Sequence, residues 1–128
     1  MRVLSTFAPA KVNLTLKVGP PQPDGFHPLA SVTTFADVGD RLTLTPADQF
    51  ELVVTGRFAA ASGPVEHNSV YRAARAFAQV LHGGRIPRVR LHLEKNLRVG
   101  AGLGGGSADA AATLRLLRHA PVSYTHLA

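Results

Sequence analysis

Glycine dominates one short segment of the chain, Gly100–Gly106, in which five of the seven residues are glycine. Each ordered glycine costs about 0.5–1 kcal/mol relative to alanine, because it loses more chain entropy on folding. Five glycines are useful where backbone N–H groups must surround an anion with no Cβ in the way. A helix predicted to begin at about Ser107 would also point its positive dipole end toward this loop. The segment therefore predicts a phosphate-binding loop.

Two familiar phosphate loops do not fit this segment. Gly100, Gly102 and Gly105 have the spacing of the dinucleotide-binding fingerprint, but that motif requires a following strand and an acidic residue about twenty positions later. No acidic residue follows Asp109. A Walker A loop requires a lysine directly after its final glycine, whereas serine follows Gly106. The loop is therefore expected to be of another kind.

Asp109 is the acidic residue closest to the glycine segment. A kinase places a carboxylate near the attacking hydroxyl, which makes Asp109 a candidate for catalysis. It also falls in the first turn of the predicted helix, where the helix dipole alone favours aspartate. We therefore interpret Asp109 as a helix-start residue rather than as a catalytic base.

The elements that position this loop follow from periodicity. Alternation or β-branched and aromatic composition predicts strands at residues 12–18, 29–38, 41–45, 50–55 and 88–94. The strands at 41–45 and 50–55 are expected to pair as a hairpin. Apolar residues recur with helical spacing between Val70 and Leu81, with Asn68 or Ser69 as the cap, and a second helix is expected from about Ser107 to Arg118. The order predicts an α+β fold, a mixed sheet with helices on one face, as in the two-layer fold of some ribosomal proteins.

Composition narrows the function classes. The chain has 128 residues, enough for one domain, and no cysteine, which excludes disulfides and thiolate chemistry. Its net charge of +6 arises entirely in residues 65–128, which favours an anionic partner. No apolar run is long enough to span a bilayer, and the histidines lack metal-ligand spacing, so we expect a cytoplasmic protein without a structural metal site.

Three ordered motifs carry a family resemblance. The Gly100–Ser107 loop, opening an alanine-rich helix, resembles the central motif of the GHMP kinases, named for their galactose, homoserine, mevalonate and phosphomevalonate members. Pro9–Leu14 and Pro23–Leu29 resemble two signatures of the member that acts on a cytidine-diphosphate-linked methylerythritol, and Val65–Val70 and Leu93–Leu97 are also similar to it. The resemblance covers residues from about 8 to about 118 and implies the GHMP kinase N-terminal fold.

The resemblance also implies an activity and a set of site residues. The expected reaction transfers the γ-phosphoryl group of ATP, with Mg²⁺, to a tertiary hydroxyl of that small molecule in the non-mevalonate isoprenoid pathway. Lys11 matches the active-site lysine, and Asn13, Phe26 and His27 match positions that bind the substrate, with Phe26 and His27 holding the cytosine ring. The residues expected to hold the ATP phosphates are Val99, Gly100, Ala101, Gly102, Leu103, Gly104, Gly105, Gly106, Ser107 and Ala108.

The resemblance ends before the family pattern does. Residues 1–118 are expected to form the ATP-binding N-terminal domain, while residues 119–128 depart from the pattern. Members of the family continue to a catalytic aspartate in a Gly-Ala-Asp-Val-Pro stretch and to a C-terminal domain, and the 128 residues match neither. We therefore expect this chain, a fragment relative to the family, to be inactive as a kinase by itself.

Two other functions remain open. A different small-molecule GHMP kinase would share the glycine loop but not Lys11–Asn13 and Asp24–His27. A non-catalytic RNA-binding module would use the arginines of the second half for phosphate contacts, although the five glycines and the few aromatic residues argue against it. We expect a small-molecule substrate and no nucleic acid or membrane partner, and the oligomeric state stays open.

Overall fold

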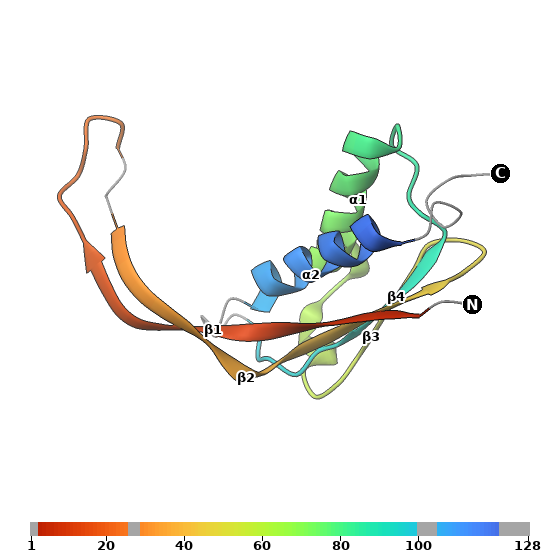
Figure 1. Ribbon diagram of the computed structural model, residues 1–128, viewed down its shortest axis with the longest axis horizontal. Coiled ribbons are helices and arrows are strands. Elements are labelled where there is room, and N and C mark those ends of the chain that lie inside the picture. The colour runs from red at the N-terminus through yellow and green to blue at the C-terminus, as the bar shows by residue number, and fades with distance from the viewer. Residues whose placement is uncertain (1–2, 26–28, 100–104, 121–128) are drawn as a thin grey trace.

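The structure is a computed structural model, shown in Figure 1. It describes residues 3–25, 29–99 and 105–120, without the side chains of 12–18, 29–34 and 36. Four strands and two α-helices make up the described part, together with short 3₁₀ helices at Ala59–Ser62 and Val65–His67: β1 Leu4–Val18, β2 Leu29–Pro46, β3 Glu51–Thr55, α1 Ser69–Leu81, β4 Val89–Glu94 and α2 Gly105–His119. The predicted order is thus largely confirmed, with differences in how the strands divide and pair.

The strands form one mixed sheet in the order β1-β2-β4-β3. β4 pairs antiparallel with β2 and parallel with β3. The predicted hairpin between residues 41–45 and 50–55 is therefore wrong, because β4 lies between these two segments. A short polar turn favours a hairpin locally, but β4 offers Val89, Leu91 and Leu93 as a buried ridge that a β2–β3 pair would not have.

β1 and β2 are longer than the sequence pattern predicted. β1 begins at Leu4, and the predicted segments 29–38 and 41–45 are both parts of β2. The two strands pair antiparallel along their length, from Leu4 opposite Leu44 to Val18 opposite Leu29. Their outer parts extend away from the helices as a two-stranded arm (Figure 1). Gly39 allows the close approach of the strands at the base of this arm, since a Cβ there would lie 2.7 Å from Pro9 Cα.

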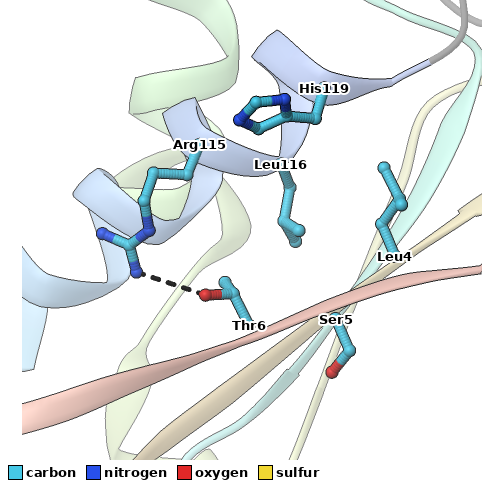
Figure 2. Close-up of a pocket in the computed structure, with 6 residues that line it drawn as sticks. All are labelled: Leu4, Ser5, Thr6, Arg115, Leu116 and His119. Carbon is cyan, nitrogen blue, oxygen red and sulfur yellow. Dashed lines mark hydrogen bonds between the residues drawn. The ribbon is translucent and has the colours of Figure 1, made fainter.

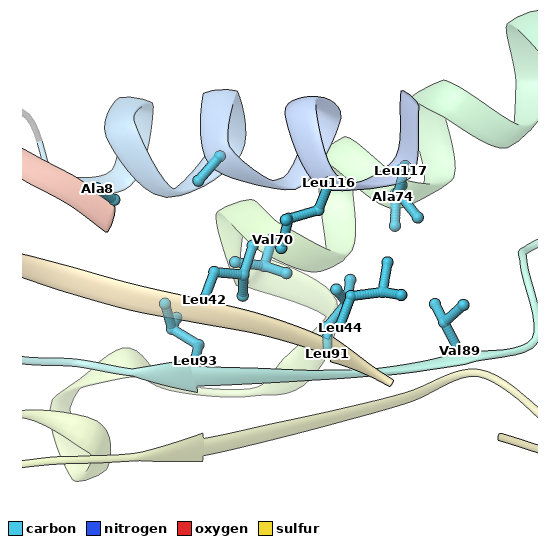
Figure 3. Close-up of a cluster of buried hydrophobic side chains, with 11 residues drawn as sticks. Ala8, Leu42, Leu44, Val70, Ala74, Val89, Leu91, Leu93, Leu116 and Leu117 are labelled. Carbon is cyan, nitrogen blue, oxygen red and sulfur yellow. The ribbon is translucent and has the colours of Figure 1, made fainter. Parts of the chain in front are cut away.

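Both helices cover one face of the sheet (Figure 1), which confirms the predicted α+β class. Figure 3 shows the core between the helices and the sheet, where side chains of α1 and α2 meet inward residues of the strands. The members of this core are Ala8, Leu42, Leu44, Val70, Ala74, Val89, Leu91, Leu93, Ala112, Leu116 and Leu117. The core fixes both helices on the sheet, and with them the segments that enter and leave the glycine-rich loop.

The starts of the two helices are set differently. Asn68 caps α1 as expected, with its side-chain Oδ1 accepting the backbone N–H of Val70 at 2.9 Å. α2 begins at Gly105, two residues before the predicted start. The last two glycines of the glycine-rich segment therefore belong to the first turn of α2.

Candidate phosphate-binding site

The glycine-rich segment leads directly into the N-terminus of α2. Gly100, Ala101, Gly102, Leu103 and Gly104 lie outside the described residues. Val99 before them is exposed, and Gly105 and Gly106 after them begin the helix. The first N–H groups of an α-helix have no partner within the helix and carry its positive dipole end. The described flanks thus have the strand-loop-helix arrangement that suits an anion.

The N-terminus of α1 lies beside that of α2. A Cβ on Gly106 would lie 3.9 Å from Ser69 Oγ, so the two helix starts are in close contact. Between them is a groove of about 580 Å³ lined by Ser69, Arg72, Ala73, Ala76, Gly106, Ser107, Ala110 and Leu114. Two hydroxyls, one guanidinium and two positive helix ends therefore surround a space with apolar walls. Such a groove can bind an oxyanion through N–H and O–H donors while an apolar group packs on the walls.

Three buried charged side chains lie behind the start of α2. Lys95 Nζ donates to Asp40 Oδ2 at 2.7 Å and to Asp109 Oδ2 at 2.9 Å. The side chains are 7%, 0% and 2% exposed, respectively. Asp40 Oδ1 accepts the backbone N–H groups of Asn96 at 2.7 Å and Leu97 at 2.9 Å. Residues from β2, from the segment after β4 and from α2 are thus joined in one network.

The network changes the pKa of each of its members. Burial, followed by hydrogen bonding to Asp40, raises the pKa of Asp109 from 3.8 to about 7. Burial alone would raise the pKa of Asp40, but hydrogen bonds from Asp109, Lys95 and two backbone N–H groups hold it below its usual value. Burial would lower the pKa of Lys95, yet its two carboxylate partners raise it. One lysine cannot neutralise two carboxylates, so Asp109 takes up a proton more readily than an exposed aspartate does.

Asp109 is therefore not the helix-start residue that the sequence predicted. It lies one turn inside α2 because the helix begins earlier, and its side chain is buried against Lys95. The pattern of buried residues on α2, which also includes Ala112, Thr113, Leu116 and Leu117, places Asp109 on the inward face. Its carboxylate is bonded to a buried ammonium, so it is not free to bind a metal ion or to act on a substrate.

The other predicted site residues lie on or beyond the arm. Lys11 is exposed on β1 and pairs with Phe35 of β2. Asn13 follows in the same uninterrupted register, opposite Thr33, but its side chain lies outside the described part. Phe26 and His27 lie outside the described residues altogether. Their roles stay predictions.

Four residues near the site, Asp40, Lys95, Ser69 and Arg72, were given no role on the basis of the sequence. Asp40 and Lys95 could have been noticed because each continues the inward alternation of its strand. In β4 and the residue after it, positions 89, 91, 93 and 95 are all buried. In β2 the buried positions are 40, 42 and 44. A charged residue in such a series signals a buried ion pair.

A second hollow lies at the other end of α2, against the edge strand β1 (Figure 2). Its volume is about 550 Å³ and its lining is Leu4, Ser5, Thr6, Arg115, Leu116 and His119. Arg115 Nη2 donates to Thr6 Oγ1 at 3.4 Å and to the backbone oxygen of Phe7 at 3.3 Å. None of the predicted site residues line this hollow. Its contacts anchor the end of α2 to β1.

Across the described residues, no cluster of three or more His, Cys, Asp or Glu side chains could hold a metal ion. No helix in the described part is long and apolar enough to cross a membrane.

The fold and the groove agree with comparisons to known proteins. Residues 68–126 match the family described as GHMP kinases N terminal domain. A homoserine kinase from Cytophaga hutchinsonii shares the fold, with a TM-score of 0.56 and 19% identity over 88% of this chain. The chain therefore carries the N-terminal domain of the GHMP kinases.

Within that class, the similarity is to one enzyme. The chain is a homologue of the 4-diphosphocytidyl-2-C-methyl-D-erythritol kinases, with 53% identity over 117 residues to those of Caulobacter vibrioides and Xanthobacter autotrophicus. A crystal structure of 4-(cytidine 5′-diphospho)-2C-methyl-D-erythritol kinase superposes with a TM-score of 0.73 and 34% identity over 98% of this chain. The chain spans about 40% of the length of these relatives.

Proposed function

We propose that the chain is the ATP-binding part of a kinase that phosphorylates a hydroxyl of 4-diphosphocytidyl-2-C-methyl-D-erythritol, a step of isoprenoid synthesis in the cytoplasm. The groove between the two helix starts is the observation that carries this proposal. It joins Ser69, Arg72 and Ser107 with the N-terminus of α2, directly after the glycine-rich segment. Homology to this kinase over 91% of the chain supports the choice of reaction and substrate.

Residues 99–108 and the groove would share the nucleotide. Phosphate oxygens would accept hydrogen bonds from the backbone N–H groups at the start of α2 and from the Ser107 hydroxyl. The apolar wall formed by Ala73, Ala76 and Leu114 suits a purine ring or ribose better than another charged group. Holding phosphates in place and neutralising their charge is most of what phosphoryl transfer requires of a protein.

Mg²⁺ would be bound mainly through the nucleotide. Mg²⁺ prefers carboxylates together with substrate phosphates, but Asp109, the carboxylate behind the groove, is bonded to Lys95. Of the described groove residues, Ser107 is the one we propose for contact with the ion, through its hydroxyl. The ion would add positive charge at the phosphates, and no carboxylate of the described residues is proposed as its ligand.

The acceptor side of the reaction would lie along the arm. Lys11 would place an ammonium next to the acceptor hydroxyl, where it favours negative charge on the oxygen as the bond to phosphorus forms. Asn13, Phe26 and His27 would bind the cytidine-containing substrate, with ring stacking by Phe26 and a directed hydrogen bond from His27. This assignment rests on the homology and on the position of Lys11 on β1.

The proposal is tested by calorimetric titration of the 128-residue chain with MgATP, tripolyphosphate and a mixed RNA. We expect saturable binding of MgATP that tripolyphosphate displaces. A chain that binds RNA with steep salt dependence and ignores ATP would instead be an RNA-binding module. In a parallel assay with ATP, Mg²⁺ and the cytidine substrate, we expect no turnover by this chain alone. Turnover would contradict the prediction that the catalytic aspartate lies beyond residue 118.

A further inference from the structure

The Asp40–Lys95–Asp109 network holds both sides of the glycine-rich segment. Before the segment, Asp40 Oδ1 accepts the N–H groups of Asn96 and Leu97. After it, Lys95 Nζ bonds Asp109 on α2. Asp40 and Lys95 bond each other at 2.7 Å, which joins the two sides. A loop rich in glycine has little conformational preference of its own, so its geometry depends on where its ends are held.

Lys95 itself is fixed through its backbone. Its N–H donates to the carbonyl oxygen of Thr55 at 2.7 Å, and its own carbonyl oxygen accepts the N–H of Phe58 at 3.1 Å. Gly56 packs so closely on this backbone that a Cβ there would lie 2.7 Å from the Lys95 carbonyl oxygen. The ammonium group therefore extends from a rigid base at the end of β3.

The start of α2 rests directly on this ammonium group. A Cβ on Gly105 would lie 3.1 Å from Lys95 Nζ and 3.5 Å from Leu97 Cδ1. The absence of a side chain at Gly105 is what lets the helix approach so closely. The contact between Lys95 and Asp109 thus sets both the height and the rotation of the first turns of α2 over the sheet.

Packing alone does not require three buried charges. Replacing a buried ion pair with apolar groups of similar size is often neutral or stabilising, and this cluster has an unmatched negative charge. A directed bond between an ammonium and a carboxylate specifies position more narrowly than apolar contact does. We propose that Lys95 and Asp109 are positioning residues for the phosphate-binding loop, holding the start of α2 where its N–H groups meet the phosphates. This proposal rests on the proposed function of residues 99–108.

Two substitutions at one position separate positioning from stability. Asp109→Asn keeps an oxygen that accepts from Lys95, whereas Asp109→Leu removes the acceptor and leaves Lys95 in a neutral pair with Asp40. Leu116→Ala is the matched control, because Leu116 lies on the same inward face of α2, two turns further from the loop. The readouts are the dissociation constants for MgATP and tripolyphosphate, and amide hydrogen exchange in α1 and α2.

We expect Asp109→Leu to weaken binding of both ligands at least tenfold and to speed exchange at the start of α2 at least tenfold relative to α1. Asp109→Asn should change binding less than twofold at pH 7. Leu116→Ala should lower the unfolding temperature and leave affinity unchanged. Unchanged binding and exchange in Asp109→Leu would overturn the proposal. Losses in Leu116→Ala as large as those in Asp109→Leu would also overturn it.

Gly105→Ala tests the same contact from the helix side if Asp109→Leu does not fold. Alanine favours a helix more than glycine, so the variant should fold, but its methyl group must displace Lys95 Nζ. We expect faster exchange at residues 95–97 and weaker ligand binding, and unchanged exchange there would overturn the proposal. If the unaltered chain binds neither ligand, the proposed function fails, while hydrogen exchange still decides whether Lys95 and Asp109 position α2.

Discussion

The stability of the chain should fall as pH rises from about 4 to about 7, and Asp109→Asn should remove this fall. In the folded chain the pKa of Asp109 is about 7, above its ordinary value of 3.8. A group whose folded pKa is raised contributes stability that is complete below the unfolded pKa and is lost as pH rises through the folded pKa. The pKa of Asp40 is lowered and that of Lys95 is raised, so these two change charge outside the window from pH 5 to pH 8.

The size of the effect follows from the pKa difference. A shift from 3.8 to about 7 covers about three pH units, and each unit is worth about 1.4 kcal/mol, which sets a ceiling of about 4 kcal/mol. We expect about 2 kcal/mol between pH 5 and pH 8, because a small movement of α2 lets water reach the ionised carboxylate and lowers its cost. Asparagine has the shape of aspartate but no proton to lose, so only the constant part of the stability should change.

Urea unfolding followed by circular dichroism at pH 5, 6, 7 and 8 gives the free energy of unfolding of each variant. Asp48→Asn is the control, because Asp48 is exposed in the turn after β2 and its curve should run parallel to that of the unaltered chain. Parallel curves for Asp109→Asn and the unaltered chain across this range would refute the reasoning. So would a fall with rising pH that is steeper in Asp109→Asn.

Three further substitutions test the groove, the helix cap and the core. Arg72→Ala should weaken tripolyphosphate binding about five- to tenfold, since it removes a cation that lines the groove, whereas Arg75→Ala, exposed on α1 outside the groove, should not; equal losses would contradict the assignment of the groove. Asn68→Ala should cost about 1 kcal/mol of stability through loss of the α1 cap, measured by thermal unfolding, and an unchanged midpoint would show that the cap is dispensable. Leu44→Ala should cost about 2–5 kcal/mol in urea unfolding because it leaves a cavity in the core, and a loss below about 1 kcal/mol would mean that the core refills around it.

Periodicity predicted the helices and most of the strand segments because these features are local. The spacing from Val70 to Leu81 gave α1 within a residue of its bounds, and Asn68 is its cap. The pairing of strands was less predictable, since it depends on contacts far apart in the sequence. A turn at residues 46–49 is compatible with a hairpin, and nothing within that segment shows that β4, more than forty residues later, occupies the place beside β2.

The candidate site was predicted in part. The glycine-rich segment indicated where phosphate would bind, because an ordinary turn does not need five glycines and each of them costs chain entropy. The buried charges behind it were not recognised, although Asp40, Lys95 and Asp109 each occupy an inward position of its own element. A charged residue usually marks the end of an apolar pattern. Only the three-dimensional structure shows that three such positions meet.

The place of β4 between β2 and β3 has a consequence for how the chain folds as it is synthesised. β1 and β2 are close in sequence and can pair early, but β3 gains its neighbour only when β4 has left the ribosome. Until then the inner edge of β2 has open backbone groups, and Asp40 has no lysine to cover it. Lys95 follows β4 by one residue, so the strand that completes the sheet and the charge that neutralises Asp40 arrive together. Closure of the sheet and burial of its carboxylate are thus expected to be a single late event, governed by long-range contacts and correspondingly slow.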